Sequence, residues 1–179
     1  MNRFQIIKVS YSNYITEDIN HFKQQLNKHL GYLKGKFVYS LQFNEELCKL
    51  TGRIYGIPVY IGGTEDLNDR LYRHFKGLYP SFTYAPNMEK GRAIYKFVKN
   101  SNVNDDILNK LGNYIFGIVH DYTDSNIELV NAEAEEIKKH KLLYGARPSL
   151  NKREEKVAIG NQTMVRKHFE PSSLANNGV

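Results

Sequence analysis

Three side chains that could act on a phosphate group stand close together in the middle of the chain. Tyr60 ends a short apolar run, the dipeptide Gly62-Gly63 interrupts that run, and Arg70 and His74 belong to the helix expected next. Residues four apart share one helical face, so Arg70 and His74 are expected to point together toward the end of the strand. A guanidinium matches the shape and charge of a phosphate, and a tyrosine hydroxyl can reach one.

Further candidates lie on either side of this segment. Upstream, Lys36-Phe37-Val38-Tyr39 begins an apolar run that is expected to be a strand and carries a second tyrosine, Tyr39. Downstream, three glutamates lie in the segment 132–138, and the chain then reaches Pro148-Ser149-Leu150-Asn151. These glutamates are Glu133, Glu135 and Glu136, on a helix expected from Ile127 to His140 with Ile127, Val130, Ala134 and Ile137 as its buried stripe.

Taken together, these segments resemble the signature of the GIY-YIG nucleases. Tyr60-Ile61-Gly62 matches the second triplet of the family, and Phe37-Val38-Tyr39 stands for the first, Gly-Ile-Tyr. Arg70 and His74 follow at the family's spacing. A glutamate four residues before Ile137-Lys138 resembles the family's late glutamate. This spacing selects Glu133, while Glu135 and Glu136 remain competitors. The resemblance spans Lys36 to Asn151.

The resemblance implies a metal-dependent endonuclease that hydrolyses phosphodiester bonds in DNA. In such nucleases a tyrosine hydroxyl, from Tyr39 or Tyr60, takes a proton from the attacking water. Arg70 would hold the scissile phosphate, with His74 beside it, and Glu133 would bind one Mg²⁺ or Mn²⁺ ion. An unperturbed tyrosine has a pKa near 10, so this role needs neighbours that favour the phenolate.

Two departures from the family pattern matter. The first triplet lacks its glycine, and many relatives have a lysine after Tyr-Ile-Gly where this chain has Gly63. The second departure leaves open which cation lowers the tyrosine pKa. The separation of Tyr39 from Tyr60 also exceeds the usual one, so Asn44–Gly56 is expected to be an inserted loop or hairpin tip.

The charge balance favours a polyanionic partner. Among 179 residues there are 25 Lys and Arg against 19 Asp and Glu, a formal charge of +6. Such a balance is typical of nucleic-acid-binding proteins, although a simple solvated surface explains it too. The residues expected to contact DNA are Arg73, Lys76, Arg92, Lys96, Lys138 and Arg147.

The order of expected elements predicts an α/β (α+β) fold. Three strands, near Tyr39, Val59–Ile61 and Tyr114–Val119, alternate with helices, one of which Thr64 is expected to cap. The resemblance implies that these strands form a small three-stranded antiparallel sheet flanked by helices. Phe4–Val9 is a further candidate strand, and an extra N-terminal helix is expected from Ile19 to Leu33. We divide the chain into an extension (1–35), a nuclease-like domain (36–151) and a polar tail (152–179).

The remaining features limit the functional classes. The single cysteine, Cys48, excludes a disulfide within the chain and argues against a cysteine-based zinc site. No signal peptide and no apolar stretch long enough to cross a bilayer are evident, so a cytoplasmic protein without a membrane partner is expected. Compactness favours a restriction-like enzyme or one encoded by a phage or mobile element. Cutting both DNA strands would need a homodimer or two sequential nicks, and the alternative function is a catalytically idle DNA-binding module.

Overall fold

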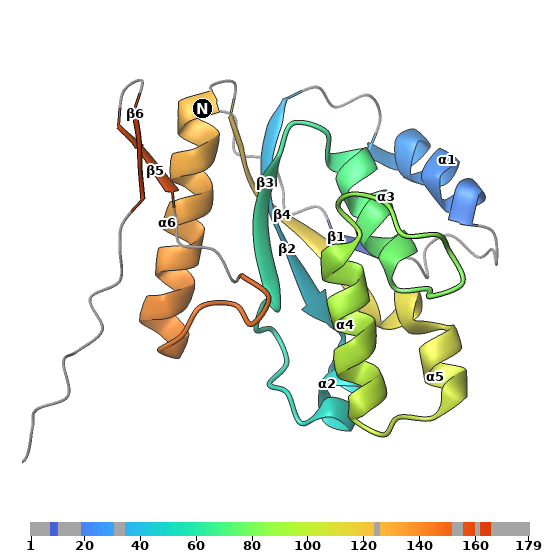
Figure 1. Cartoon of the computed structure of the whole chain (residues 1–179). Helices are drawn as coiled ribbons and strands as arrows, with labels where there is room; N and C mark the ends of the chain where they lie inside the picture. Colours follow the sequence, from blue (N-terminus) through green and yellow to red (C-terminus); the bar gives the residue numbers. More distant parts are fainter. Residues whose placement is uncertain are drawn as a thin grey trace, which may run out of the picture.

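The computed structural model describes residues 8–10, 19–30, 35–123, 126–151, 156–159 and 162–165. It has the predicted α+β fold, in which an antiparallel sheet lies between two layers of helices (Figure 1). The elements are β1 (Lys8–Ser10), α1 (Ile19–Leu30), β2 (Lys36–Phe43), α2 (Glu45–Thr51), β3 (Tyr60–Thr64), α3 (Leu67–Gly77), α4 (Glu89–Asn100), α5 (Asp105–Asn109), the 3-10 helix η2 (Leu111–Tyr114), β4 (Ile115–Thr123), α6 (Asn126–Tyr144), β5 (Lys156–Ile159) and β6 (Gln162–Val165).

The sheet has the strand order β1-β4-β2-β3, and each neighbouring pair is antiparallel. The three expected strands are therefore confirmed, and β1 extends the sheet beyond β4 as a fourth. Residues 4–7 of the strand expected at Phe4–Val9 lie outside the described residues. At the opposite side of the sheet β3 is the edge strand, paired with β2 so that Tyr39 lies opposite Gly62 and Val38 opposite Gly63.

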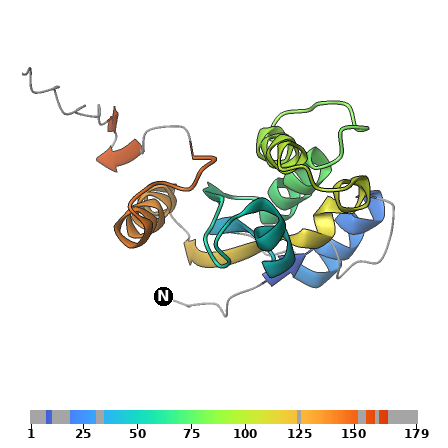
Figure 2. The ribbon, with the colours of Figure 1, turned by 90° about the horizontal axis from the view of Figure 1, so that it is seen from below.

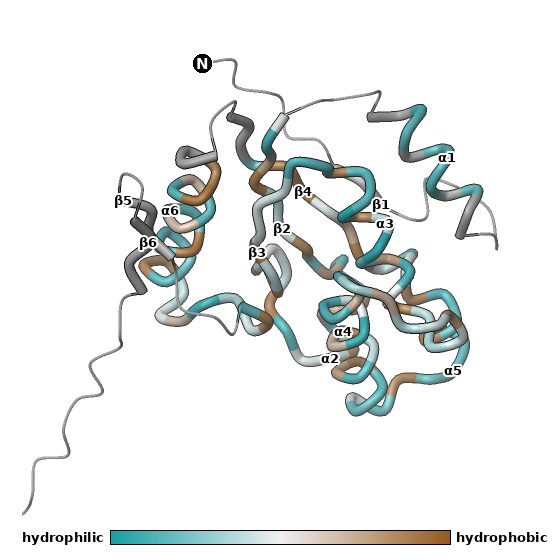
Figure 3. Tube along the Cα trace, turned by 45° about the horizontal axis from the view of Figure 1, so that its top comes forward, coloured by the Kyte–Doolittle hydropathy of each residue, from teal (hydrophilic) through white to brown (hydrophobic). Residues whose placement is uncertain are grey.

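The two faces of the sheet bury different amounts of apolar surface. On one face, alternate residues of β2 pack with α2, α3, α4 and α5 in a large cluster that includes Phe37, Leu41 and Phe43. On the other face, α6 covers a small cluster in which Val38 and Ile61 meet Ile137. In Figure 2, α6 lies on the opposite side of the sheet from α1, α3 and α4, with β5 and β6 next to it. Figure 3 shows apolar residues along the central strands.

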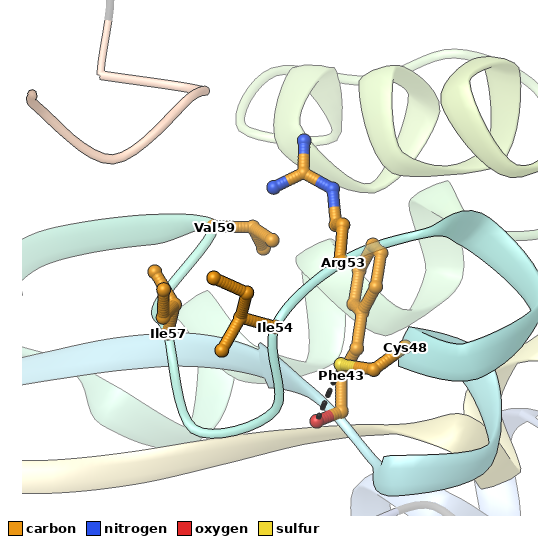
Figure 4. Close-up of a pocket in the computed structure, with 6 residues that line it drawn as sticks. All are labelled: Phe43, Cys48, Arg53, Ile54, Ile57 and Val59. Carbon is orange, nitrogen blue, oxygen red and sulfur yellow. Dashed lines mark hydrogen bonds between the residues drawn. The ribbon is translucent and has the colours of Figure 1, made fainter. Parts of the chain in front are cut away.

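The segment Asn44–Gly56 corrects the prediction of a loop or hairpin tip, because it contains helix α2. The Asn44 side chain caps that helix by accepting a hydrogen bond from the Leu47 amide, and Gly52 ends it in the left-handed conformation. Both caps were visible in the sequence. The turn after α2 contributes to an apolar pocket in which the Cys48 thiol faces the Phe43 carbonyl (Figure 4). Burial raises the pKa of that thiol, which agrees with an inert cysteine.

Two further expectations are corrected at helix boundaries and faces. Asp66, rather than Thr64, caps α3 by accepting from the Asp69 amide, while Thr64 ends β3. In α6, Ile137 is buried as expected but Val130 is exposed. Leu129 and Ala132 pack on the sheet instead, and the side chain of Ile127 lies outside the described residues. The α6 stripe is therefore rotated from the one expected.

The terminal elements add to the central unit. The helix expected from Ile19 to Leu33 is described up to Leu30, and it packs on α3 through an Asn68–Asn27 hydrogen bond of 2.9 Å. Within the polar tail, β5 and β6 form a two-stranded antiparallel sheet that the sequence did not predict. None of the described helices is sufficiently long and apolar to cross a membrane.

Candidate active site

The glycine pair Gly62-Gly63 shapes the edge of the sheet. A Cβ at Gly62 would overlap the Tyr60 hydroxyl, so the missing side chain lets the tyrosine ring fold back over its own strand. On the other face, a Cβ at Gly63 would lie 2.9 Å from Glu133 Oε2. The dipeptide thus allows functional groups from both faces of the sheet to meet at one short stretch of β3.

Two tyrosines and a histidine pack together beside Gly62. Tyr39 is fully buried, and its hydroxyl forms a 2.7 Å hydrogen bond with His74 Nε2. The Tyr60 ring is half-buried and lies edge-on to Tyr39, with ring centroids 6.0 Å apart, and to His74, with centroids 5.5 Å apart. Two strands and α3 therefore bring together three residues that the sequence selected separately.

Burial controls the protonation of this group. It lowers the pKa of His74 to about 3, assisted by the positive charges of Arg70 and Lys90, so the imidazole is neutral around neutral pH. Burial also raises the pKa of Tyr60, and the negative charge of Glu133 raises it further, whereas Arg70 lowers it. The pKa of Tyr39 is raised well above its usual value, mainly by burial.

Arg70 and Lys90 supply the positive charge. Arg70 lies one helical turn before His74, and its Nη1 donates to Asn87 Oδ1 at 2.7 Å. Lys90 comes from the first turn of α4, where its Nζ lies 5.0 Å from the centre of the Tyr60 ring and donates to the Leu150 carbonyl at 2.7 Å. A cation from another helix therefore lies beside Tyr60.

Glu133 reaches the same place from α6. Its Oε2 accepts a 2.8 Å hydrogen bond from the Gly63 amide, which points away from the sheet at the edge of β3. Burial raises the carboxyl pKa, while the Gly63 hydrogen bond and the charges of Arg70 and Lys90 lower it. Helix rotation separates the three glutamates, since Glu135 is exposed and pairs with Lys138, and Glu136 pairs with Lys139.

The donor set suits a metal ion that brings most of its own ligands. Among the described residues, no three His, Cys, Asp or Glu side chains are grouped so that they could hold a metal. Glu133 has one oxygen on Gly63 and forms no ion pair with a described basic residue. A single carboxylate of this kind fits Mg²⁺ or Mn²⁺, which commonly retain waters and bind phosphate oxygens.

The six residues expected to contact DNA have different surroundings. Arg73 pairs with Asp69, and Lys76 lies over the Tyr72 and Phe82 rings. Arg92 donates to the Phe82 carbonyl, and Lys138 pairs with Glu135. Lys96 is exposed, and Arg147 is half-buried. Arg92, and Arg73 through a hydrogen bond to the Pro86 carbonyl, therefore help to hold the α3–α4 connection in place.

Sequence reasoning missed Asn87 and Lys90, which touch Arg70 and Tyr60. Their positions depend on the crossing of α3 and α4, where Gly77 and Gly91 meet so closely that a Cβ on Gly91 would overlap the His74 carbonyl oxygen. The feature of the sequence that could have indicated this helix crossing is the pair of glycines fourteen positions apart. The Asn151 side chain donates to the Ile61 carbonyl at 2.7 Å and accepts from the Ile61 amide at 2.9 Å, which is a structural role.

Comparisons of the chain with protein-family models, curated proteins and solved structures found no match. A function must therefore be argued from the geometry and chemistry of the site itself.

Proposed function

We propose that this chain is a metal-dependent DNA endonuclease of the GIY-YIG type, hydrolysing phosphodiester bonds with one carboxylate-bound divalent cation. One observation carries the proposal. Five residues that the sequence selected across nearly a hundred positions lie around the Gly62-Gly63 stretch of β3. They are Tyr39, Tyr60, Arg70, His74 and Glu133. A phenol, a guanidinium and a carboxylate in one place suit water activation and phosphate binding.

The two tyrosines have different parts in this proposal. Tyr60 is the more exposed of the two, so its oxygen, as the phenolate, is the one that accepts the proton of the attacking water. Tyr39 is buried and hydrogen-bonded to His74, so the Tyr39–His74 pair holds the Tyr60 ring in place. Arg70 orients the phosphate and offsets the charge that develops on it.

Charge explains why a cation is needed. The carboxylate of Glu133 raises the pKa of Tyr60 and so opposes the phenolate form that a base requires. A divalent cation bound to Glu133 would offset that negative charge and polarise the phosphate. Arg70, whose charge lowers the pKa of Tyr60, favours the phenolate in the same direction.

The test is cleavage of supercoiled plasmid and of a long mixed-sequence DNA, with Mg²⁺ or Mn²⁺ and with EDTA. The wild type should cut only with metal, and Glu133→Ala and Tyr60→Phe should each lower the rate by at least about 100-fold. Glu135→Gln is the matched control, because Glu135 lies on the same helix but faces solvent. It should cut like the wild type.

Other outcomes have distinct meanings. Metal-dependent cutting that survives Glu133→Ala would contradict the assignment of the carboxylate. Tight DNA binding that is unchanged by EDTA, without cutting of either DNA by the wild type, would favour the idle DNA-binding module. Absence of both binding and cutting would overturn the nucleic-acid hypothesis.

A further inference from the structure

The connection between α3 and α4 ends in an unusual backbone conformation. Among the described non-glycine residues, Asn87 and Asn102 have positive φ, at 67° and 55°. Asparagine tolerates this left-handed region better than most residues, but the surroundings must still hold it there. Asn87 lies immediately before Met88 and α4, whereas Asn102 lies in an exposed turn between α4 and α5.

Contacts from both neighbouring helices fix the connection around Asn87. From α3, Arg73 Nη1 donates to the Pro86 carbonyl at 3.2 Å. From α4, Arg92 donates to the Phe82 carbonyl. Within the turn, the Ala85 amide faces Met88 Sδ at 3.2 Å, and Met88 itself is fully buried. The backbone at Asn87 is therefore braced from two sides.

The braced conformation aims the Asn87 side chain at Arg70. Asn87 Oδ1 accepts the 2.7 Å hydrogen bond from Arg70 Nη1, across seventeen residues of sequence. Arg70 is close enough to the candidate site to change the pKa of His74, Tyr60 and Glu133. An amide oxygen satisfies one guanidinium N–H while leaving the positive charge intact, which a carboxylate at this position would offset.

We infer that Asn87 is a positioning residue for Arg70, holding its guanidinium in the orientation that receives the phosphate of the substrate without neutralising it. This inference rests on the proposed function. Orientation before binding removes the need to order a long flexible side chain in the transition state. Loss of Asn87 should therefore lower kcat more than it raises KM.

The chain offers a matched pair of variants. Asn87→Gly tolerates the positive φ and removes the side chain with its acceptor oxygen, and Asn102→Gly makes the same change at the other left-handed asparagine. Asn87→Asp keeps an acceptor oxygen and tolerates the same backbone, but it adds a negative charge beside Arg70. The three variants separate backbone strain, hydrogen bonding and charge.

The first readout is the guanidinium NMR signal of Arg70, assigned by its loss in Arg70→Lys. In the wild type and in Asn102→Gly the Nη–H signals should be resolved, because the hydrogen bond slows guanidinium rotation. They should average in Asn87→Gly and stay resolved in Asn87→Asp. The second readout is DNA cleavage, in which Asn87→Gly should lose about 10- to 100-fold in kcat. Asn102→Gly should lose nothing, and Asn87→Asp should raise KM because its carboxylate competes with phosphate.

Failure of this inference can be told from failure of the proposed function. Unchanged Arg70 signals and unchanged kcat in Asn87→Gly would overturn the inference, as would an equal loss in Asn102→Gly. If the wild type cuts no DNA, the proposed function fails, and inorganic phosphate then becomes the probe. A phosphate-induced shift of the Arg70 signal that weakens in Asn87→Gly would support the positioning role, and an equal or absent shift would contradict it.

Discussion

The two walls of the candidate site are built differently. The sheet wall, formed by β2, β3, α3 and α4, belongs to the large core, and its polar groups are linked by the Tyr39–His74 and Arg70–Asn87 hydrogen bonds. The helix wall, formed by α6, rests on a small cluster around Ile137 and brings Glu133 to the site through one hydrogen bond to Gly63. Groups that need fixed geometry thus lie in the well-packed wall, while Glu133, the metal ligand that we propose, lies on a wall with a smaller apolar cluster.

The comparison extends to charge. Each wall buries a residue whose burial favours the neutral form near neutral or acidic pH: His74 in the sheet wall and Glu133 in the helix wall. The pKa of the base is lowered and that of the acid is raised. Acid should therefore act on the two walls in opposite directions.

The largest expected effect concerns packing. Leu71, fully buried in α3, lies against Gly117 of β4, whereas Ile137 belongs to the small cluster. Leu71→Ala should lower the free energy of unfolding by about 4 kcal/mol and Ile137→Ala by about 2 kcal/mol, because the larger core collapses less readily around a cavity. Chemical denaturation measures both. Equal losses of unfolding free energy in the two variants would mean that the two walls do not differ in how tightly they are packed.

The second prediction uses the glycine pair as a direct comparison. Gly62→Ala would press a methyl group into the Tyr60 ring, which Tyr39 and His74 hold from behind, and should cost about 3 kcal/mol. Gly63→Ala meets only the ends of the Glu133 and Leu129 side chains and should cost about 1 kcal/mol. Thermal unfolding would rank the two variants, and the reverse order would show that Glu133 is held more firmly than the ring.

The third prediction is the acid response of the sheet wall. In the unfolded chain His74 takes up a proton near its usual pKa of 6.5, but in the folded protein it does so only near 3. Its contribution to stability is therefore present above pH 6.5 and is lost progressively as the pH falls toward 3. Relative to His74→Gln, which does not titrate, the wild type should lose stability across this range. Parallel pH profiles of the two proteins would contradict a buried neutral imidazole.

The smallest effect is the response of the helix wall. The pKa of Glu133 is raised in the folded protein, so its contribution to stability is present below its usual value of 4.5 and is lost as the pH rises through the folded value. Glu133→Gln should therefore be more stable than the wild type at neutral pH, by no more than about 1 kcal/mol. The difference should shrink on acidification. A destabilised Gln variant at neutral pH would mean that the carboxylate is needed for folding.

The sequence predicted those parts of the site that lie on regular elements with a periodic pattern. Arg70 and His74 share a helical face because four residues nearly complete a turn. Glu133 was selected by the resemblance rather than by the α6 stripe, and its side chain reaches Gly63. Asn87 and Lys90 were not predictable in this way. Their neighbours are set by a helix crossing and a left-handed turn, and neither leaves a periodic signal in the sequence.

The groups that hydrogen-bond to the outer edge of β3 affect the tendency of the protein to aggregate in concentrated solution. The outward backbone groups of β3 are used by Asn151 at Ile61 and by Glu133 at Gly63, and the Leu150 amide binds the Val59 carbonyl just before the strand. An exposed edge strand with unused hydrogen-bonding groups is a template on which another chain can add a strand and start aggregation. In this protein, the same short segments that form the candidate site already use the hydrogen-bonding groups of this edge. Asn151→Ala should therefore promote self-association on standing, and light scattering would detect it.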